Sequence, residues 1–318
     1  MRETNILYQS PIDYEALVKA VLSDAEAYRG HGDVAKHLPA LGSVNPNKMG
    51  IAIALGDGST YVAGDADEPF SLQSISTIFS LSLALGQVGA ALWNHVGREP
   101  AGSAFNALVQ LESEKGKPRN PLINAGAIIV CDQLIGRDTA DEALEDILEF
   151  LRERSGDQNI AVDQNVAMSE SNAGALNRSL AHFVSAFGNL QNPVEEVLSV
   201  YFRQCAIAMT CRQLARAALF LAFDGTDPVT KAEVCIPSRS RRINALMLTA
   251  GHYDNSGDFA FRIGLPGKSG SGGGILAIVP RVGAVAVWSP GLNAARTSLA
   301  GAILLEKLVE RTSWSIFV

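Results

Sequence analysis

The stretch Phe70-Ser-Leu-Gln-Ser-Ile-Ser-Thr-Ile-Phe-Ser-Leu-Ser-Leu-Ala-Leu85 guides the interpretation of the whole chain. It follows a turn-rich acidic segment at 64–69, and its apolar residues recur at three- and four-residue steps, which predicts a helix. Gln73 and Ser74 therefore stand where this helix begins, beside backbone N–H groups that have no partner within the helix. Ser74 is either a helix N-cap or a nucleophile with oxyanion donors next to it.

Two predicted β-hairpins lie on either side of this region. The first has strands at 49–55 and 59–63 around a Gly-Asp-Gly turn, and the second has strands at 274–280 and 282–288 around a Pro-Arg turn. Each hairpin has an apolar face that must be buried. Pairing the two hairpins in one antiparallel sheet buries both faces.

Helical patterns fill most of the chain between the hairpins, including amphipathic runs at 138–153 and 210–223. Helices are also predicted near both ends, at 11–23 and 298–311, and a weakly alternating strand at 259–265. The predicted fold class is therefore α+β, with an antiparallel sheet flanked by helices and an inserted helical subdomain.

This order of elements also predicts the domain organisation. We expect residues 1–73 and 240–318 to form the sheet and its flanking helices, and 74–239 to form the helical subdomain. The active site is expected at the seam between them, where Ser74 lies.

Composition limits the partners and the compartment. The net charge is −7 and Lys and Arg are scattered, which argues against nucleic acid and against an anionic membrane surface as partners. The N-terminus lacks a signal-peptide core, and the most apolar run, 271–290, is broken by Gly, Pro and Arg. The cysteines form no C-x-x-C pair and the histidines no ligand spacing, so we expect reduced thiols, a cytoplasmic protein and no metal.

A second chemical motif is Lys268-Ser269-Gly270, within the glycine-rich run 264–275. It resembles the K-T-G element of serine enzymes whose nucleophile stands in an S-x-x-K motif. The alternatives are a phosphate-binding loop or a plain turn. The order G-x-x-x-x-G-K-S/T is missing and a strand follows, which makes nucleotide binding the weaker interpretation. Together with Ser74, the motif favours serine acyl transfer.

Other polar residues have both a structural and a functional interpretation. Asn124 interrupts an apolar run, so it is either a satisfied structural amide or a substrate contact. Glu170 and Asn177 are two helical turns apart, on one face if the segment is helical. Two polar residues on one helix face are most often simply exposed to solvent. Tyr201 and Tyr253 are ordinary amphipathic residues unless they fall near Ser74.

The motifs as a set resemble those of the serine-dependent glutaminases, the L-glutamine amidohydrolases. The matching blocks follow the family order over nearly the whole chain: 70–79, 120–127, 169–170 with 177–178, 201–205, 253–257, 264–270 and 272–275. The resemblance implies a β-lactamase/transpeptidase-like fold and a homodimer or homotetramer. It also implies hydrolysis of L-glutamine to L-glutamate and ammonia without any cofactor.

The resemblance also implies roles for individual residues. Ser74 would be the nucleophile, and its N–H would form the oxyanion hole with that of Ser271. Tyr201 and Tyr253 would relay protons. The substrate's α-amino and α-carboxylate groups would be held by Asn124, Glu170, Asn177 and Tyr253, with Gln73 close by.

The chain departs from the family pattern at three positions. Thr77 stands where the family has a lysine, His37 where it usually has a tyrosine, and Ser271 where many members have valine. Threonine is not a base near neutral pH, whereas a serine nucleophile needs one.

Three hypotheses follow from these departures. In a glutaminase, Tyr201, Tyr253 or His37 must supply the missing base. In the second hypothesis, the chain is a catalytically inactive homologue that still binds glutamine, and Thr77 is either natural or engineered. A β-lactamase-like hydrolase is disfavoured because an S-D-N element is not evident.

Overall fold

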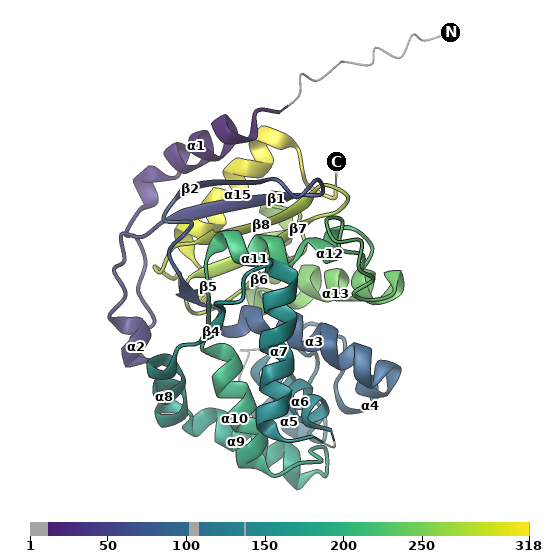
Figure 1. The fold of residues 1–318 in the computed structure, drawn as a ribbon. Helices are drawn as coiled ribbons and strands as arrows, with labels where there is room; N and C mark the ends of the chain where they lie inside the picture. The colour runs from purple at the N-terminus through teal and green to yellow at the C-terminus, as the bar shows by residue number, and fades with distance from the viewer. Residues whose placement is uncertain (1–11, 102–107, 137, 318) are drawn as a thin grey trace.

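The computed structural model describes residues 12–101, 108–136 and 138–317 (Figure 1). Its main sheet is antiparallel, and β1 pairs with β8 from Gly50 opposite Trp288 to Leu55 opposite Gly283. The prediction that two hairpins distant in sequence share one sheet is therefore confirmed. The order of the five strands is β2 (Thr60–Gly64), β1 (Gly50–Leu55), β8 (Gly283–Trp288), β7 (Gly274–Val279) and β6 (Gly267–Ser269).

Over most of β1 and β8, the two faces of the sheet differ in side-chain size, because successive residues of a strand point to opposite faces. Larger residues such as Ile51 and Val287 pack in the cluster that also holds α1 (Tyr14–Asp24) and α15 (Leu299–Thr312). Alanines of β1 and β8 occupy the other face, in the cluster shared with α11 (Cys211–Ala217) and α12 (Leu219–Ala222). These small residues let the helices pack closely on the strands that position the site.

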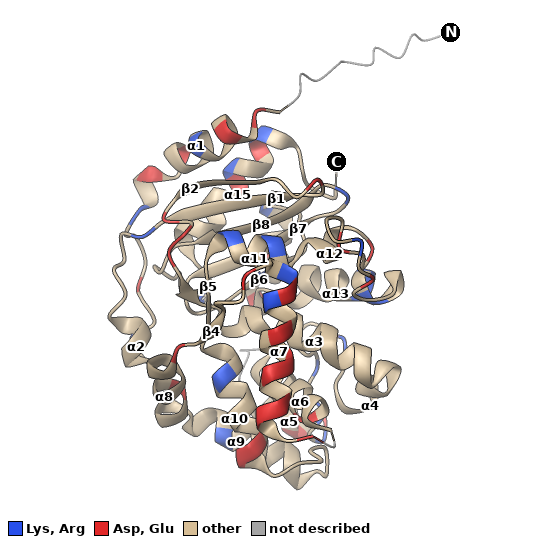
Figure 2. Ribbon diagram, in the orientation of Figure 1, with Lys and Arg blue, Asp and Glu red and all other residues tan. Residues whose placement is uncertain are grey.

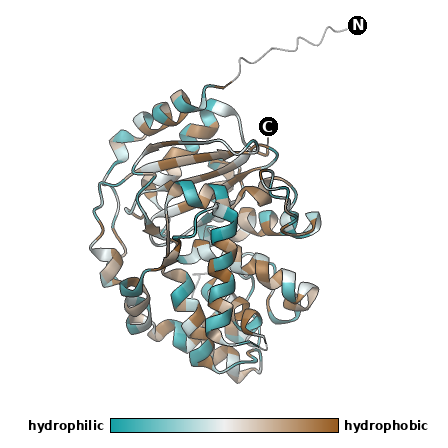
Figure 3. Ribbon diagram, viewed as in Figure 1, coloured by the Kyte–Doolittle hydropathy of each residue, from teal (hydrophilic) through white to brown (hydrophobic). Residues whose placement is uncertain are grey.

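The lower layer in Figure 1 is mainly helical, as the sequence predicts. Two helices, α2 (Pro39–Gly42) and α13 (Pro237–Ala250), are connecting helices. The helices of the layer itself are α3 (Ser76–Gln87), α4 (Leu92–His95), α5 (Leu108–Ser113), α6 (Asn124–Ile135), α7 (Ala140–Ser155), α8 (Gln164–Ala173), α9 (Ala175–Ala186) and α10 (Val194–Cys205). Figure 2 shows acidic residues along the visible face of α7, and Figure 3 shows the same face as hydrophilic. The opposite face of α7 is buried, which gives the amphipathic helix predicted there.

A small second sheet joins the helical layer to the segment that holds Ser74. Its strands follow the order β3 (Phe70–Ser71), β5 (Ile207–Met209) and β4 (Ala161–Val162). After β3, the backbone N–H of Leu72 donates to the carbonyl of Ile207 at 2.9 Å. The chain is thus fixed immediately before Gln73 and Ser74.

Two predicted elements need correction. The first helix begins at Tyr14 rather than at 11, because the Asp13 side chain accepts a hydrogen bond from the Ala16 N–H and caps it; Pro11 lies outside the described residues. The strand predicted at 259–265 is wrong, since α14 (Ser256–Arg262) occupies this segment. Phe259 and Ile263 are buried one helical turn apart, whereas Phe261 between them is 90% exposed. In so short a run, this four-residue spacing is easily mistaken for alternation.

Candidate active site

Ser74 lies in a 3₁₀ turn, Gln73–Ile75, that leads directly into α3. The prediction that Ser74 stands where a helix begins is therefore confirmed. Gln73 adopts the left-handed conformation with φ 51°, which is uncommon for a residue other than glycine and recurs at functional sites. Gln73 and Ile75 are buried while Ser74 is half-buried, so the turn presents the Ser74 hydroxyl to an open space.

The glycine-rich run packs against the backbone of this turn. A Cβ atom at Gly270 would lie 2.4 Å from the Leu72 carbonyl oxygen, and one at Gly272 would lie 2.2 Å from that of Ser71. Only glycine permits such an approach. The approach sets Ser271 beside the turn, where its hydroxyl donates to the Gln73 Oε1 at 3.0 Å.

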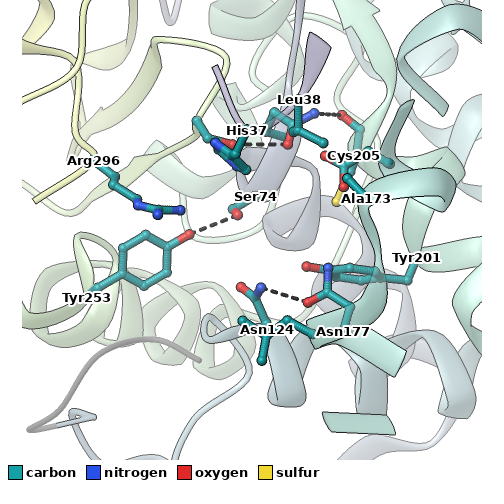
Figure 4. A pocket seen from close by; sticks show the side chains of 14 residues that line it. His37, Leu38, Ser74, Asn124, Ala173, Asn177, Tyr201, Cys205, Tyr253 and Arg296 are labelled. Carbon is teal, nitrogen blue, oxygen red and sulfur yellow. Dashed lines mark hydrogen bonds between the residues drawn. The ribbon is translucent and has the colours of Figure 1, made fainter. Parts of the chain in front are cut away.

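Tyr253 lies between the second motif and Ser74. It lies in the 3₁₀ turn Tyr253–Asn255 with φ 57°, and its hydroxyl donates to the Ser74 Oγ at 2.8 Å (Figure 4). Burial raises the pKa of Tyr253 to about 12, although the hydrogen bond to Ser74 and the charge of Arg296 act to lower it. The phenol therefore stays protonated at rest and can give a proton to Ser74 or to a leaving group.

Lys268 lies on β6, completely buried behind the Tyr253 ring. Its Nζ is 4.4 Å from the centre of that ring and donates to the carbonyl oxygens of Gly251 at 3.1 Å and Ser269 at 2.6 Å. Burial lowers the pKa of this amine to about 7. The K-S-G motif in the sequence pointed to this lysine, but its place behind Tyr253 depends on the sheet register.

The other side of Ser74 is polar and acidic. Asn124, the first residue of α6, donates through Nδ2 to the Oδ1 of Asn177 in α9 at 2.9 Å. Glu170 in α8 is only 6% exposed, and burial raises its pKa to about 7 against the opposing effect of a hydrogen bond from Gln73. Burial also raises the pKa of Tyr201, in α10, well above its ordinary value.

All but one of the site residues predicted from sequence line a single pocket, a cavity of about 170 Å³. These residues are Gln73, Ser74, Asn124, Glu170, Asn177, Tyr201, Tyr253 and Ser271. Thr77 is the exception, since it is 1% exposed in the first turn of α3 and does not line the cavity. His37 also lines it, as does Cys205 from the matching block 201–205. The sequence offered no signal for the remaining lining residues, Leu38, Ala173, Leu176 and Arg296.

The structure describes the ranges 12–101, 108–136 and 138–317. Within them, no group of three or more His, Cys, Asp or Glu residues could hold a metal ion. No helix in these ranges is sufficiently long and apolar to cross a membrane.

Comparison with known proteins gives a consistent result over nearly the full length. The chain is 53% identical over 305 residues to a glutaminase of Rhizobium rhizogenes, covering 96% of this chain and 99% of the relative. It is 54% identical over 305 residues to a glutaminase of Methylobacterium sp., with the same coverage of both chains.

Solved structures agree with the sequence relatives. The chain matches the probable glutaminase ybaS with a TM-score of 0.89 and 34% identity, covering 95% of this chain and 98% of that one. It matches a Bacillus subtilis probable glutaminase with a TM-score of 0.85 and 32% identity, covering 96% of both chains. The β-lactamase-like fold of these proteins confirms the predicted fold class. Residues 32–317 match the model of the glutaminase family, and this chain belongs to that family.

Proposed function

We propose that this chain hydrolyses L-glutamine to L-glutamate and ammonia with Ser74 as the nucleophile. The observation that supports this most directly is the 2.8 Å hydrogen bond from the Tyr253 hydroxyl to the Ser74 Oγ, inside a pocket that ends in a buried carboxylate. A nucleophile, a proton donor and an ammonium-binding group then share one cavity. A relative that is 53% identical to this chain in sequence is named a glutaminase.

In this proposal, the amino-acid end of glutamine binds on the Glu170 side of Ser74. The Glu170 carboxylate pairs with the α-ammonium group, and the side chains of Asn124 and Asn177 donate to the α-carboxylate. Gln73 and Tyr201 complete this end of the pocket. The γ-carboxamide is then directed at Ser74.

The chemical steps follow from the groups around Ser74. Its Oγ attacks the amide carbon while the backbone N–H groups of Ser74 and Ser271 stabilise the developing oxyanion. Tyr253 gives a proton to the departing ammonia, with Tyr201 nearby in the pocket. Water then hydrolyses the γ-glutamyl ester and releases glutamate, which restores Ser74.

Lys268 replaces, in this proposal, the lysine that the family pattern places at position 77. Among the described residues it is the one fully buried lysine, and its pKa of about 7 leaves a free amine near neutral pH. Lys268 acts through Tyr253 rather than on the serine itself. The free amine takes up the phenol proton of Tyr253, and the resulting phenolate accepts the Ser74 hydroxyl proton as Oγ attacks. The ammonium group then lies beneath the ring, where its charge stabilises the phenolate.

Ammonia release from L-glutamine, measured beside the Thr77→Lys variant, tests the proposed function. We expect the chain to release ammonia and Thr77→Lys to change kcat/KM by less than about tenfold, because one base is already in place. An inert chain that Thr77→Lys activates would support the glutamine-binding homologue instead. Hydrolysis of a chromogenic β-lactam, rather than of glutamine, would support the third hypothesis.

Glutamine affinity is expected to rise by about tenfold between pH 6 and pH 8. Burial raises the pKa of Glu170 to about 7, so the carboxyl is neutral below that pH and attracts the α-ammonium group only above it. Calorimetric titration of the Ser74→Ala protein measures this affinity without turnover. Glu170→Gln in the same background is expected to bind weakly and to remove the slope, and an unchanged slope would contradict the assignment.

We further propose a homodimer or homotetramer located in the cytoplasm. Large exposed apolar side chains such as Phe261 fit an interface with a second copy, and the free cysteines fit a reducing compartment. We also propose two domains, one formed by residues 1–73 and 240–318 and the other, the helical subdomain, by residues 74–239.

A further inference from the structure

Arg296 lines the mouth of the pocket from a tightly bonded loop. In this loop the Arg296 N–H donates to the Asn293 carbonyl at 2.9 Å, and the Asn293 N–H donates to the Thr297 carbonyl at 2.9 Å. A β-bridge between Leu292 and Ser298 closes it. Arg296 itself has φ 59°, an uncommon conformation for a side-chain-bearing residue. The loop backbone therefore holds the Cα atom of Arg296 at a defined place beside the pocket.

The loop is also joined to the segment that holds His37. The N–H of Asp33 donates to the Leu292 carbonyl at 3.0 Å, and the Leu292 N–H donates back to the Asp33 carbonyl at 3.0 Å. The pKa of His37 is lowered first by burial and then by the charge of Arg296, which places the two side chains within electrostatic reach. One edge of the mouth thus carries the Arg296 guanidinium group with a neutral imidazole near it.

The pocket consequently has two ends of opposite charge. Figure 4 shows Arg296 and Tyr253 on one side of Ser74, and Asn177 and Tyr201 on the other. Glu170 belongs to the second side, since its charge acts on Tyr201. A substrate whose amino end lies at Glu170 and whose amide carbon lies at Ser74 has its amide nitrogen directed toward Tyr253 and Arg296.

We propose that Arg296, with His37, forms a subsite for a carboxylate carried by the leaving amine. The chain then also cleaves γ-glutamyl amides of amino acids, in which the amide nitrogen of glutamine bears a carboxylated substituent. This inference rests on the proposed function and extends it, because the same acyl group is transferred to Ser74. Guanidinium groups suit carboxylates through paired N–H donors.

The reaction balances in the same way as for glutamine. The Ser74 Oγ forms a bond to the γ-carbon of the substrate, and the bond from that carbon to the amide nitrogen breaks. The leaving nitrogen takes a proton from Tyr253 and departs as a free amino acid rather than as ammonia. Water then cleaves the γ-glutamyl ester and releases glutamate, so no oxidant or other reactant is needed.

The matched substrates are γ-L-glutamylglycine and γ-L-glutamylglycinamide, which differ only in a terminal carboxylate against a carboxamide. Because Arg296 is exposed, we expect a preference in kcat/KM of about three- to tenfold for the carboxylate. Added salt should reduce this preference through screening. Arg296→Gln should abolish it, and Arg296→Lys should keep part of it.

Arg281→Gln is the matched control. Arg281 is also exposed, has φ 64° and lies in the turn between β7 and β8, so the same charge is removed from the same backbone conformation elsewhere. The substrate preference should persist in this variant. A preference lost equally in both variants would reflect overall charge and would overturn the subsite.

Two further outcomes would also overturn it. The first is glutamine cleavage without cleavage of γ-glutamylglycine. The second is an Arg296→Gln variant that loses activity equally on both γ-glutamyl substrates and on glutamine, because Arg296 would then bind the α-carboxylate. If no substrate is cleaved, the proposed function fails, and binding of the two amides to Ser74→Ala decides the subsite. Equal dissociation constants would count against it, and tighter binding of γ-glutamylglycine would support it.

Discussion

Replacing Ser74 with alanine is expected to lower kcat/KM for L-glutamine by about 10⁴- to 10⁶-fold, the range typical of a lost nucleophile. The hydroxyl is the acceptor of the Tyr253 hydrogen bond and is half-buried at the start of α3. Its loss removes the covalent step and leaves the remaining pocket in place. Ammonia release measures the rate, and calorimetry on the same protein should still detect glutamine binding.

Ser80→Ala is the control for this variant. Ser80 lies one turn further along α3, is buried, and donates only to backbone carbonyls of its own helix. It should keep activity within about threefold, because the change removes one local hydrogen bond away from the pocket. A Ser74→Ala protein that binds glutamine and still releases ammonia at a comparable rate would show that another group is the nucleophile.

Replacing Lys268 with methionine is expected to lower kcat by about 10²- to 10⁴-fold, the range for a lost acid–base group. Methionine keeps the length and the burial of the side chain but removes the amine behind the Tyr253 ring. Thermal unfolding checks that the variant folds. Full activity in a folded Lys268→Met protein would contradict the proposed role.

The pH profile separates this role from a structural one. Since burial lowers the pKa of Lys268 to about 7, kcat should rise as pH increases through 7 and the amine becomes free. This rise of kcat around pH 7 should be absent in Lys268→Met. Glu170 titrates in the same range but acts on binding, so its effect belongs to KM rather than to kcat. Partial rescue of Lys268→Met by Thr77→Lys would further indicate that an amine is what the site requires.

The sequence predicted the sheet and the helical start at Ser74 because both depend on local patterns. The apolar runs of β1 and β8 are buried on both faces of the sheet, and the apolar residues after Ser74 are buried in α3. The strand predicted at 259–265 failed because a seven-residue helix is too short for its period to be distinguished from alternation.

Some of the residues that line the pocket could be predicted from the sequence, and others could not. Those within matching motifs, such as Asn124 and Glu170, could be placed by resemblance, and they line the same pocket. Arg296 could not, because an exposed loop arginine has no distinguishing pattern until the bridge from Leu292 to Asp33 sets its loop at the mouth. The place of Lys268 behind Tyr253 likewise depends on the register of β6 against β7.

The pairing of β1 with β8 has a consequence for the order of folding during synthesis. β1 is made early together with its neighbour β2, but its other neighbour, β8, comes from the last part of the chain, as does the glycine run that contacts the Ser74 turn. Contacts so distant in sequence form slowly and late. While the chain is still being made on the ribosome, the edge of β1 that later pairs with β8 is therefore unpaired. Hydrolytic activity can arise only after the C-terminal segment has emerged.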